Sequence, residues 1–236
     1  MRIDQRKNNE LREIKIEKSP MGFSTGSVII STGKTKVLCS ASIEEGVPGF
    51  LAGKNQGWLT AEYSMLPGST VPRTNRGNNR KGRSQEIQRL IGRSLRAALD
   101  FTKLGENTVI VDCDVLQADG GTRTAAITGG YVALHIAISQ CQKENIIKEN
   151  PLINKIAATS IGLLGSDVLL DLCYEEDSSA GADFNLVMAD NGNIIEIQGA
   201  AEKQTFDTKT VHDVLEVGSL GIKKIFEIQN KIISEL

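Results

Sequence analysis

Apolar residues alternate or cluster in short runs along much of the chain, and punctuating turns separate the runs. Residues 27–31 and 36–41 flank Thr32-Gly33-Lys34, a combination typical of a β-hairpin. Leu11, Ile14 and Ile16 indicate an earlier strand. Similar runs predict further strands at 58–66, 109–116, 156–164, 167–174, 184–188 and 194–197. The last four form two more predicted hairpins, so the chain is rich in strands.

Three other stretches repeat their apolar residues every three or four positions, which predicts helices. The first has Ser84 as its N-cap and continues to about Thr102. The second begins at 122–124, directly after a glycine-rich turn. The third starts at Asp207 and continues to the end of the chain, with an expected interruption at Gly218 or Gly221. Strands and helices together predict an α/β (α+β) fold.

Small residues recur every four positions on the second predicted helix, so one of its faces is nearly flat and can pack closely: Ala125, Gly129, Ala133 and Ala137. Between the two parts of the chain, residues 148–154 are polar but too few for a flexible linker. We therefore expect one domain, 1–236, with two intimately packed halves at roughly 1–150 and 151–236.

Charge is distributed unevenly along the 236 residues, although the formal net charge is only −2. Residues 73–96 hold eight basic residues against one acidic residue, a local charge of +7, so the remainder carries −9. Such a cluster predicts an anionic partner, and nucleic acid is the first candidate. Residues 67–83 lack apolar periodicity and are expected to form a mobile basic loop, whose RNA-binding candidates are Arg73, Arg76, Arg80 and Lys81. A solvated helix face is favoured over RNA contact for Arg89, Arg93 and Arg96.

The four cysteines, Cys39, Cys113, Cys141 and Cys173, lie in apolar surroundings without metal-ligand or redox spacing. We interpret them as small buried residues of a protein in a reducing compartment. The N-terminus has no apolar core of a signal peptide, and no run reaches the length of a membrane span. These features predict a cytoplasmic protein.

A glycine turn follows the strand at 109–116 and opens the second helix. Gly120 and Gly121 allow positive φ and close approach of a ligand, and Thr122 and Arg123 then begin the helix. A helix N-terminus offers unpaired N–H groups, to which an arginine adds a forked cation. This predicts a phosphate-binding site, although a tight connection with a surface arginine fits the motif equally well. Arg83 precedes the first helix in a similar position.

An acidic stretch, residues 175–183, separates the two hairpins of the second half and consists of small and acidic residues. A solvated turn is the usual interpretation of such a stretch. Asp183, however, immediately precedes an apolar strand, which would hold it on a rigid edge. Asp177 and Asp183 are therefore candidate ligands for Mg²⁺, a hard cation that prefers carboxylate and water oxygens.

Six stretches resemble the ribonuclease PH family of phosphate-dependent exoribonucleases, which trim transfer RNA 3′ ends: 35–48, 56–67, 86–90, 104–129, 176–183 and 194–199. The resemblance implies a ribosomal-protein-S5 domain 2-like fold in duplicate, with two packed βαβ-type halves, and a homohexamer built as a trimer of dimers. It further implies that inorganic phosphate, the co-substrate, binds at Arg83, Gly121, Thr122 and Arg123. Asp177 and Asp183 would serve Mg²⁺ and proton chemistry.

The chemistry that the resemblance implies agrees with the residues present. The only histidines, His135 and His212, lack a serine or cysteine partner arrangement, which argues against a covalent nucleophile. Phosphorolysis needs none, because phosphate itself attacks, and the reverse reaction would add nucleotides to RNA. Gly68 stands where the family commonly has an arginine, whereas Arg73 and Arg76 match it better.

Two other functions compete with the exoribonuclease: a catalytically silent RNA-binding ring subunit and a nucleotide-dependent kinase. Retention of both arginines and both aspartates favours the enzyme over the silent subunit. The kinase lacks a Gly-x-x-x-x-Gly-Lys-Ser/Thr loop.

Overall fold

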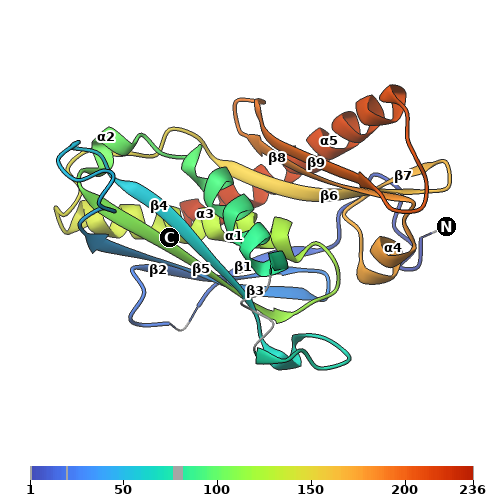
Figure 1. The fold of residues 1–236 in the computed structure, drawn as a ribbon, viewed down its shortest axis with the longest axis horizontal. Helices are drawn as coiled ribbons and strands as arrows, with labels where there is room; N and C mark the ends of the chain where they lie inside the picture. Colours follow the sequence, from blue (N-terminus) through green and yellow to red (C-terminus); the bar gives the residue numbers. More distant parts are fainter. Residues whose placement is uncertain (1, 20, 77–81, 236) are drawn as a thin grey trace.

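The structure is a computed structural model that describes residues 2–19, 21–76 and 82–235. Within them, two sheets have the strand orders β1-β2-β3-β5-β4 and β7-β6-β8-β9 (Figure 1). The strands are β1 (Ile14–Lys18), β2 (Gly26–Thr32), β3 (Thr35–Glu45), β4 (Trp58–Met65), β5 (Asn107–Gln117), β6 (Ile156–Leu164), β7 (Asp167–Leu170), β8 (Ala182–Ala189) and β9 (Ile194–Ala201). The helices are α1 (Gly82–Arg96), α2 (Phe101–Leu104), α3 (Thr122–Lys143), α4 (Tyr174–Ser179) and α5 (Thr208–Ser234), and Pro67–Ser69 forms the short 3₁₀ helix η1.

The first sheet confirms the predicted hairpin and strands. β2 and β3 pair antiparallel around Gly33, whose φ of 57° suits the tight turn. β4 and β5 pair in parallel and are connected through α1, a βαβ unit. On β5 the buried residues Val109, Val111, Cys113 and Val115 alternate with half-exposed ones, which include Asp112 and Asp114. The two carboxylates therefore lie on the face of the sheet opposite the core.

Helix α3 is the centre of the fold, because it contacts β2 and β3 on one side and β6 on the other. Its flat face packs on the first sheet as the small-residue spacing predicts. A Cβ atom added at Gly129 would lie only 2.7 Å from Ile30 Cγ2 and 2.8 Å from Cys39 Sγ. Only glycine therefore allows this approach without moving the sheet.

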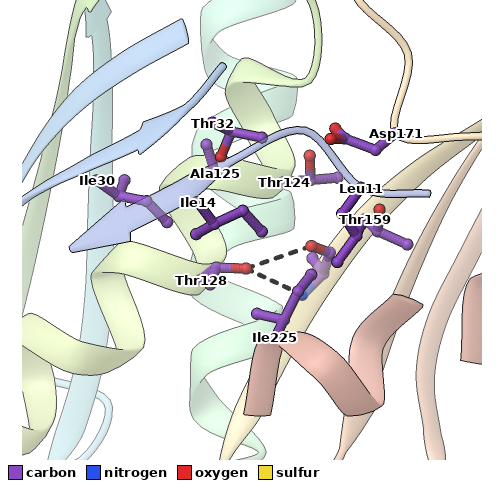
Figure 2. Close-up of a pocket in the computed structure, with 11 residues that line it drawn as sticks. Leu11, Ile14, Ile30, Thr32, Thr124, Ala125, Thr128, Thr159, Asp171 and Ile225 are labelled. Atoms are coloured by element: carbon purple, nitrogen blue, oxygen red, sulfur yellow. Dashed lines mark hydrogen bonds between the residues drawn. The ribbon is translucent and has the colours of Figure 1, made fainter. Parts of the chain in front are cut away.

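On the opposite side of α3, Thr128 binds the second half of the chain. Its hydroxyl donates to the Ala158 carbonyl oxygen at 3.3 Å and accepts from the Ala158 N–H at 3.1 Å, the two bonds drawn in Figure 2. A cavity of about 10 Å³, the size of one water molecule, lies beside this contact, between the start of α3 and β6 (Figure 2). The two sheets thus share one helix.

Two helix predictions are wrong in their boundaries. α1 begins at Gly82, so Ser84 lies buried in the first turn and is not its N-cap. α1 also ends at Arg96, before the predicted end near Thr102, because the chain leaves the helix to pair with 151–153. The Asp100 N–H donates to Pro151 at 2.8 Å, and the Ile153 N–H donates to Ala98 at 2.8 Å. Tertiary hydrogen bonds here override the helical periodicity.

Two other expectations are corrected in the second half. α5 continues through Gly218 and Gly221 without interruption. These glycines make room for the sheet, since Cβ atoms there would lie 2.7 Å from Leu186 and 2.8 Å from Leu170. The acidic stretch, expected to form a turn, contains the six-residue helix α4.

All four cysteines are free thiols; Cys39, Cys113 and Cys141 are buried and Cys173 is partly buried. Among the described helices, none combines the length and the apolar character that crossing a membrane requires.

Candidate functional site

The glycine turn between β5 and α3 forms as the sequence predicts. Gly120 and Gly121 have φ values of 73° and 65°, which favour glycine at both positions. Thr35 holds the turn from below: its hydroxyl donates to the Gly120 oxygen at 2.7 Å and accepts from the Asp119 N–H at 2.9 Å. Gly121 caps α3 without a side-chain hydrogen bond. The first N–H groups of α3 are thereby left for a ligand.

Thr122, the first residue of α3, has a partner that the sequence did not reveal. The Tyr63 hydroxyl on β4 lies 2.8 Å from the Thr122 hydroxyl. Burial raises the pKa of Tyr63, and Arg123 and Arg83 act against this rise. Both arginines therefore lie close enough to Tyr63 to influence its charge. Tyr63 shares the buried alternation of its strand and so looked like an ordinary core residue.

Asp177 on α4 and Asp183 on β8 form the acidic part of the site. Burial raises the pKa of both carboxyl groups above the ordinary value. Asp183 raises the pKa of Asp177 further, whereas Arg123 and Arg83 oppose the rise at both aspartates. Arg83, Arg123, Asp177 and Asp183 therefore influence one another electrostatically.

The glycine turn and α4 meet because Gly120 has no side chain. A Cβ atom on Gly120 would lie 2.6 Å from the Leu172 oxygen and 2.8 Å from the Cys173 carbonyl carbon. The Asp119 carboxylate also accepts from the Tyr174 N–H at 3.2 Å, at the start of α4. The proposed anion site and the acidic helix are therefore joined by direct backbone contact.

Three arginines of the N-terminal segment contact α4 or the chain that leads into it, and sequence reasoning missed them. Arg2 donates to both Glu176 oxygens at 2.7 and 2.6 Å, and Arg12 pairs with Asp171 at 2.6 Å. Arg6 donates to the Asp171 carbonyl oxygen at 3.1 Å. Figure 1 shows this segment beside α4. No local sequence signal reveals these contacts, because the partners lie more than 150 positions away in the chain.

The predicted RNA-binding residues are only partly described. Arg73 and Arg76 are exposed on the chain between η1 and α1, whereas Arg80 and Lys81 lie outside the described residues. The helix-face arginines have more partners than a solvated face implies. Arg93 donates to Glu196 at 2.6 and 2.7 Å, and Arg96 lies 4.4 Å over the Trp58 ring.

Comparison with known sequences identifies the family. Residues 10–139 match domain 1 of the 3′ exoribonuclease family, and residues 154–220 match its domain 2. Ribonuclease PH from Bacillus pumilus is 50% identical over 240 residues, which cover 100% of this chain and 99% of that protein. The chain belongs to the ribonuclease PH family. The Crocosphaera subtropica ribonuclease PH is 51% identical over 235 residues, covering 99% and 98%.

Membership of the ribonuclease PH family confirms the predicted enzyme, a phosphorolytic 3′ exoribonuclease that processes transfer RNA. It also confirms inorganic phosphate as the co-substrate and RNA as the substrate. Neither the silent subunit nor the kinase is supported.

Solved structures confirm the α/β fold. A chain of an Archaeoglobus fulgidus exosome with RNA bound to the active site has a TM-score of 0.83 and 21% identity, covering 96% of this chain and 91% of that chain. Rice Rrp46 has a TM-score of 0.81 and 19% identity, covering 98% and 100%. At such identities the likeness concerns the fold alone.

Proposed function

We propose that phosphorolysis takes place between the start of α3 and the acidic pair on α4 and β8. One observation carries this proposal: the glycine turn at the start of α3 packs directly against the chain that enters α4, where a Cβ atom on Gly120 would lie 2.6 Å from the Leu172 oxygen and Asp119 accepts from the Tyr174 N–H at 3.2 Å. The charges of Arg83 and Arg123 oppose the effect of burial, which raises the pKa of both Asp177 and Asp183. Inorganic phosphate binds the arginines and the N–H groups of Gly121, Thr122 and Arg123. Forked guanidinium groups and helix N-termini both suit an oxyanion.

In the reaction, an oxygen of inorganic phosphate attacks the phosphorus of the last phosphodiester. A new P–O bond forms, and the bond from that phosphorus to the 3′ oxygen of the preceding nucleotide breaks. The leaving 3′ oxygen takes up a proton, and the product is a nucleoside diphosphate. The arginines offset the negative charge that gathers where two phosphate groups meet. In reverse, the same site adds nucleotides from diphosphates when phosphate is scarce.

Asp177 or Asp183 supplies the proton to the leaving oxygen. A carboxyl group with a raised pKa retains a proton closer to neutral pH and is a better general acid than an ordinary aspartate. Without a bound cation, burial raises the pKa of both carboxyl groups and the charge of Asp183 raises that of Asp177 further, so both effects favour retention of a proton at this pair.

The same pair fits Mg²⁺. Two neighbouring carboxylates that repel one another are stabilised by a dication, which also offsets charge on the transferred phosphoryl group. No group of three or more histidine, cysteine or acidic side chains in the described part of the chain could hold a metal ion. Asp177 and Asp183 would therefore share Mg²⁺ with water and phosphate oxygens, an arrangement typical of this ion.

RNA approaches along the basic residues Arg73, Arg76, Arg80 and Lys81. This segment carries charge without aromatic side chains, which suits contact with phosphates and not recognition of bases.

We further propose a homohexamer arranged as a trimer of dimers, in which the two halves of each chain fold as one domain. Contacts that cross between the halves support the single domain, notably Thr128 with Ala158 and Arg93 with Glu196. Light scattering that gives a monomer at micromolar concentration would refute the ring. The four free cysteines support a location in the cytoplasm, a reducing compartment.

A direct test incubates single-stranded RNA with the enzyme and Mg²⁺, with and without inorganic phosphate. We expect nucleoside diphosphates only when phosphate is present. Primer extension from nucleoside diphosphates in phosphate-free buffer tests the reverse direction. The proposal is wrong if nucleoside monophosphates appear equally well without phosphate.

A further inference from the structure

Arg12, in the segment before β1, joins the two parts of the proposed site. Its guanidinium donates to both carboxylate oxygens of Asp171, from Nε at 3.1 Å and from Nη2 at 2.6 Å. The same group donates to the Asp119 carbonyl oxygen at 2.5 Å and reaches the Gly120 oxygen at 3.5 Å. One planar fork therefore contacts the glycine turn and the segment that leads into α4.

Two glycines make room for the Arg12 side chain. A Cβ atom on Gly33 would lie 2.7 Å from Arg12 Cδ, and one on Gly121 would lie 3.0 Å from Arg12 Nη2. Both glycines have positive φ values, which favour glycine. The absence of side chains at Gly33 and Gly121 therefore suits both the conformation of the two turns and the space that Arg12 occupies. The residue itself is only 6% exposed.

The contacts with the turn determine where its N–H groups point. In a trans peptide the C=O and N–H bonds have opposite directions. Arg12 and Thr35 draw the Gly120 oxygen toward the interior, so the N–H of Gly121 points to the other side of the turn. The contact with the Asp119 oxygen fixes the N–H of Gly120 in the same way.

The contact with Asp171 fixes the position of the acidic helix. Asp171 has a left-handed φ of 54° and donates its N–H to the Ser160 oxygen at 2.7 Å. Its carboxylate also accepts from the Arg12 N–H at 2.8 Å. Three residues later the chain enters α4, which carries Asp177. A shift of Arg12 would displace the turn and α4 relative to one another.

We propose that Arg12 is a positioning residue, which aligns the phosphate-binding turn with the carboxylate pair without touching the substrate. This inference rests on the proposed function, since it requires phosphate at the turn. Substitution of a side chain that orients the ligands of a site typically lowers affinity or activity by about 10- to 100-fold.

Arg12→Lys tests the inference, because lysine keeps the charge beside Asp171 but cannot span both segments. We expect the KM for inorganic phosphate to rise about tenfold and the half-saturating Mg²⁺ concentration to rise too, while the KM for RNA stays unchanged. Phosphate should also raise the Tm of the RNA-free variant less than that of the parent. This last readout does not depend on activity.

Arg6→Lys is the matched control. Arg6 belongs to the same segment and donates to Asp171 and Glu10 oxygens, at 3.1 and 2.8 Å, without a bond to the glycine turn. Because Arg6 differs from Arg12 in having no bond to the turn, Arg6→Lys should alter the Tm but not the phosphate dependence. If Arg12→Lys fails to fold, Thr35→Val removes the other anchor of the Gly120 oxygen without a change in charge and should raise the phosphate KM.

Three outcomes would contradict the proposal in different ways. If Arg12→Lys left both the KM for phosphate and the phosphate-induced increase in Tm unchanged, Arg12 would contribute to folding alone. Equal shifts in Arg12→Lys and Arg6→Lys would remove any specific link to the turn. If Arg123→Ala also left phosphate dependence unaltered, the proposed phosphate site itself would be wrong.

Discussion

Two neighbouring carboxyl groups on opposite sides of α4 have pKa values shifted in opposite directions. Toward the N-terminal segment, Glu176 is 2% exposed and accepts two hydrogen bonds from Arg2. Burial alone would raise the pKa of Glu176, but hydrogen bonds from Arg2 and the Cys173 N–H, together with the positive charges of Arg2 and Arg6, outweigh burial and lower the pKa. One residue later, burial and Asp183 raise the pKa of Asp177 despite Arg123 and Arg83.

This contrast distinguishes a carboxylate that stabilises the fold from one that is available to bind a ligand or a proton. Glu176 has a bidentate partner inside the protein, so its negative charge is fully used in holding the chain together. Within the described part of the chain, Arg83 and Arg123 act on the Asp177 carboxylate only through space, without a hydrogen bond or ion pair. Burial and the nearby Asp183 carboxylate make the ionised form of Asp177 unfavourable. Ligands and protons can relieve that unfavourable interaction, which is why the second side suits catalysis.

The largest effect should come from Asp177→Asn or Asp183→Asn. The amide keeps the shape but is a weak Mg²⁺ ligand and no acid, so turnover should fall by about 10²- to 10⁴-fold. Because the pKa values of both aspartates are raised in the folded protein, removing the charge should leave the Tm equal or higher. Steady-state turnover, RNA binding and thermal unfolding measure these effects.

Glu175→Gln on the same helix is the control, since Glu175 is exposed. Near-normal turnover of both aspartate variants at saturating Mg²⁺ would show that the acidic stretch is only a solvated surface segment without a catalytic role.

Glu176→Gln should act on stability and not on chemistry. Arg2 would be left buried without its counter-charge, at a cost of about 3 kcal/mol in the free energy of unfolding. Because the folded-state pKa of Glu176 is lowered, its contribution is complete above the ordinary pKa of 4.5 and is lost as the pH falls below it. Urea unfolding at several pH values should show the difference from the parent narrowing in acid. A constant difference would contradict the ion-pair explanation.

Arginines in two places should separate phosphate binding from RNA binding. Arg83→Ala or Arg123→Ala should raise the phosphate requirement steeply, with partial rescue by lysine, which lacks the fork. Arg73→Ala and Arg76→Ala should weaken RNA binding and reduce its log-log salt slope by about 0.7 for each lost phosphate contact. Phosphate titrations and RNA affinities at several salt concentrations measure both sets. If both sets of variants changed the phosphate requirement and the RNA salt slope alike, the two groups of arginines would form one undivided anion-binding surface.

The smallest effect is expected from Glu202→Gln. Glu202 is exposed and raises the pKa of both Asp177 and Asp183. Its neutralisation lowers both pKa values, so the limbs of the turnover profile that these aspartates control should move to lower pH: the acid limb for the carboxylate that must be ionised to bind Mg²⁺, and the alkaline limb for the one that donates the proton. Salt should diminish the shift, since the charge is exposed. A limb that moves upward would show that another group controls it.

Sequence patterns predicted most of the strands and the glycine turn because each depends on local information. Gly120-Gly121 before a helix start is such a signal, and so is Asp183 before an apolar strand. The predicted end of α1 was wrong because pairing of 98–100 with 151–153 overrides the helix preference. The predicted break in α5 was wrong because the sheet fills the space beside Gly218 and Gly221.

The supporting residues of the site could not be predicted in the same way. Arg2, Arg12 and Tyr63 act through partners brought near by the tertiary fold, and each looks ordinary in its own stretch of sequence. Sequence reasoning selected Asp177 from the acidic stretch but gave Glu176 no role, and only the structure shows that Glu176 is the partner of Arg2.

The position of α3 between the two sheets has a consequence for the entropy of binding. A helix held on both sides has little backbone freedom left to lose when an anion arrives at its first turn. The conformational entropy of this backbone is lost when the protein folds, so it is not lost again each time phosphate binds. Successive phosphate ions would then enter a site that requires no closing motion, even as the RNA shortens.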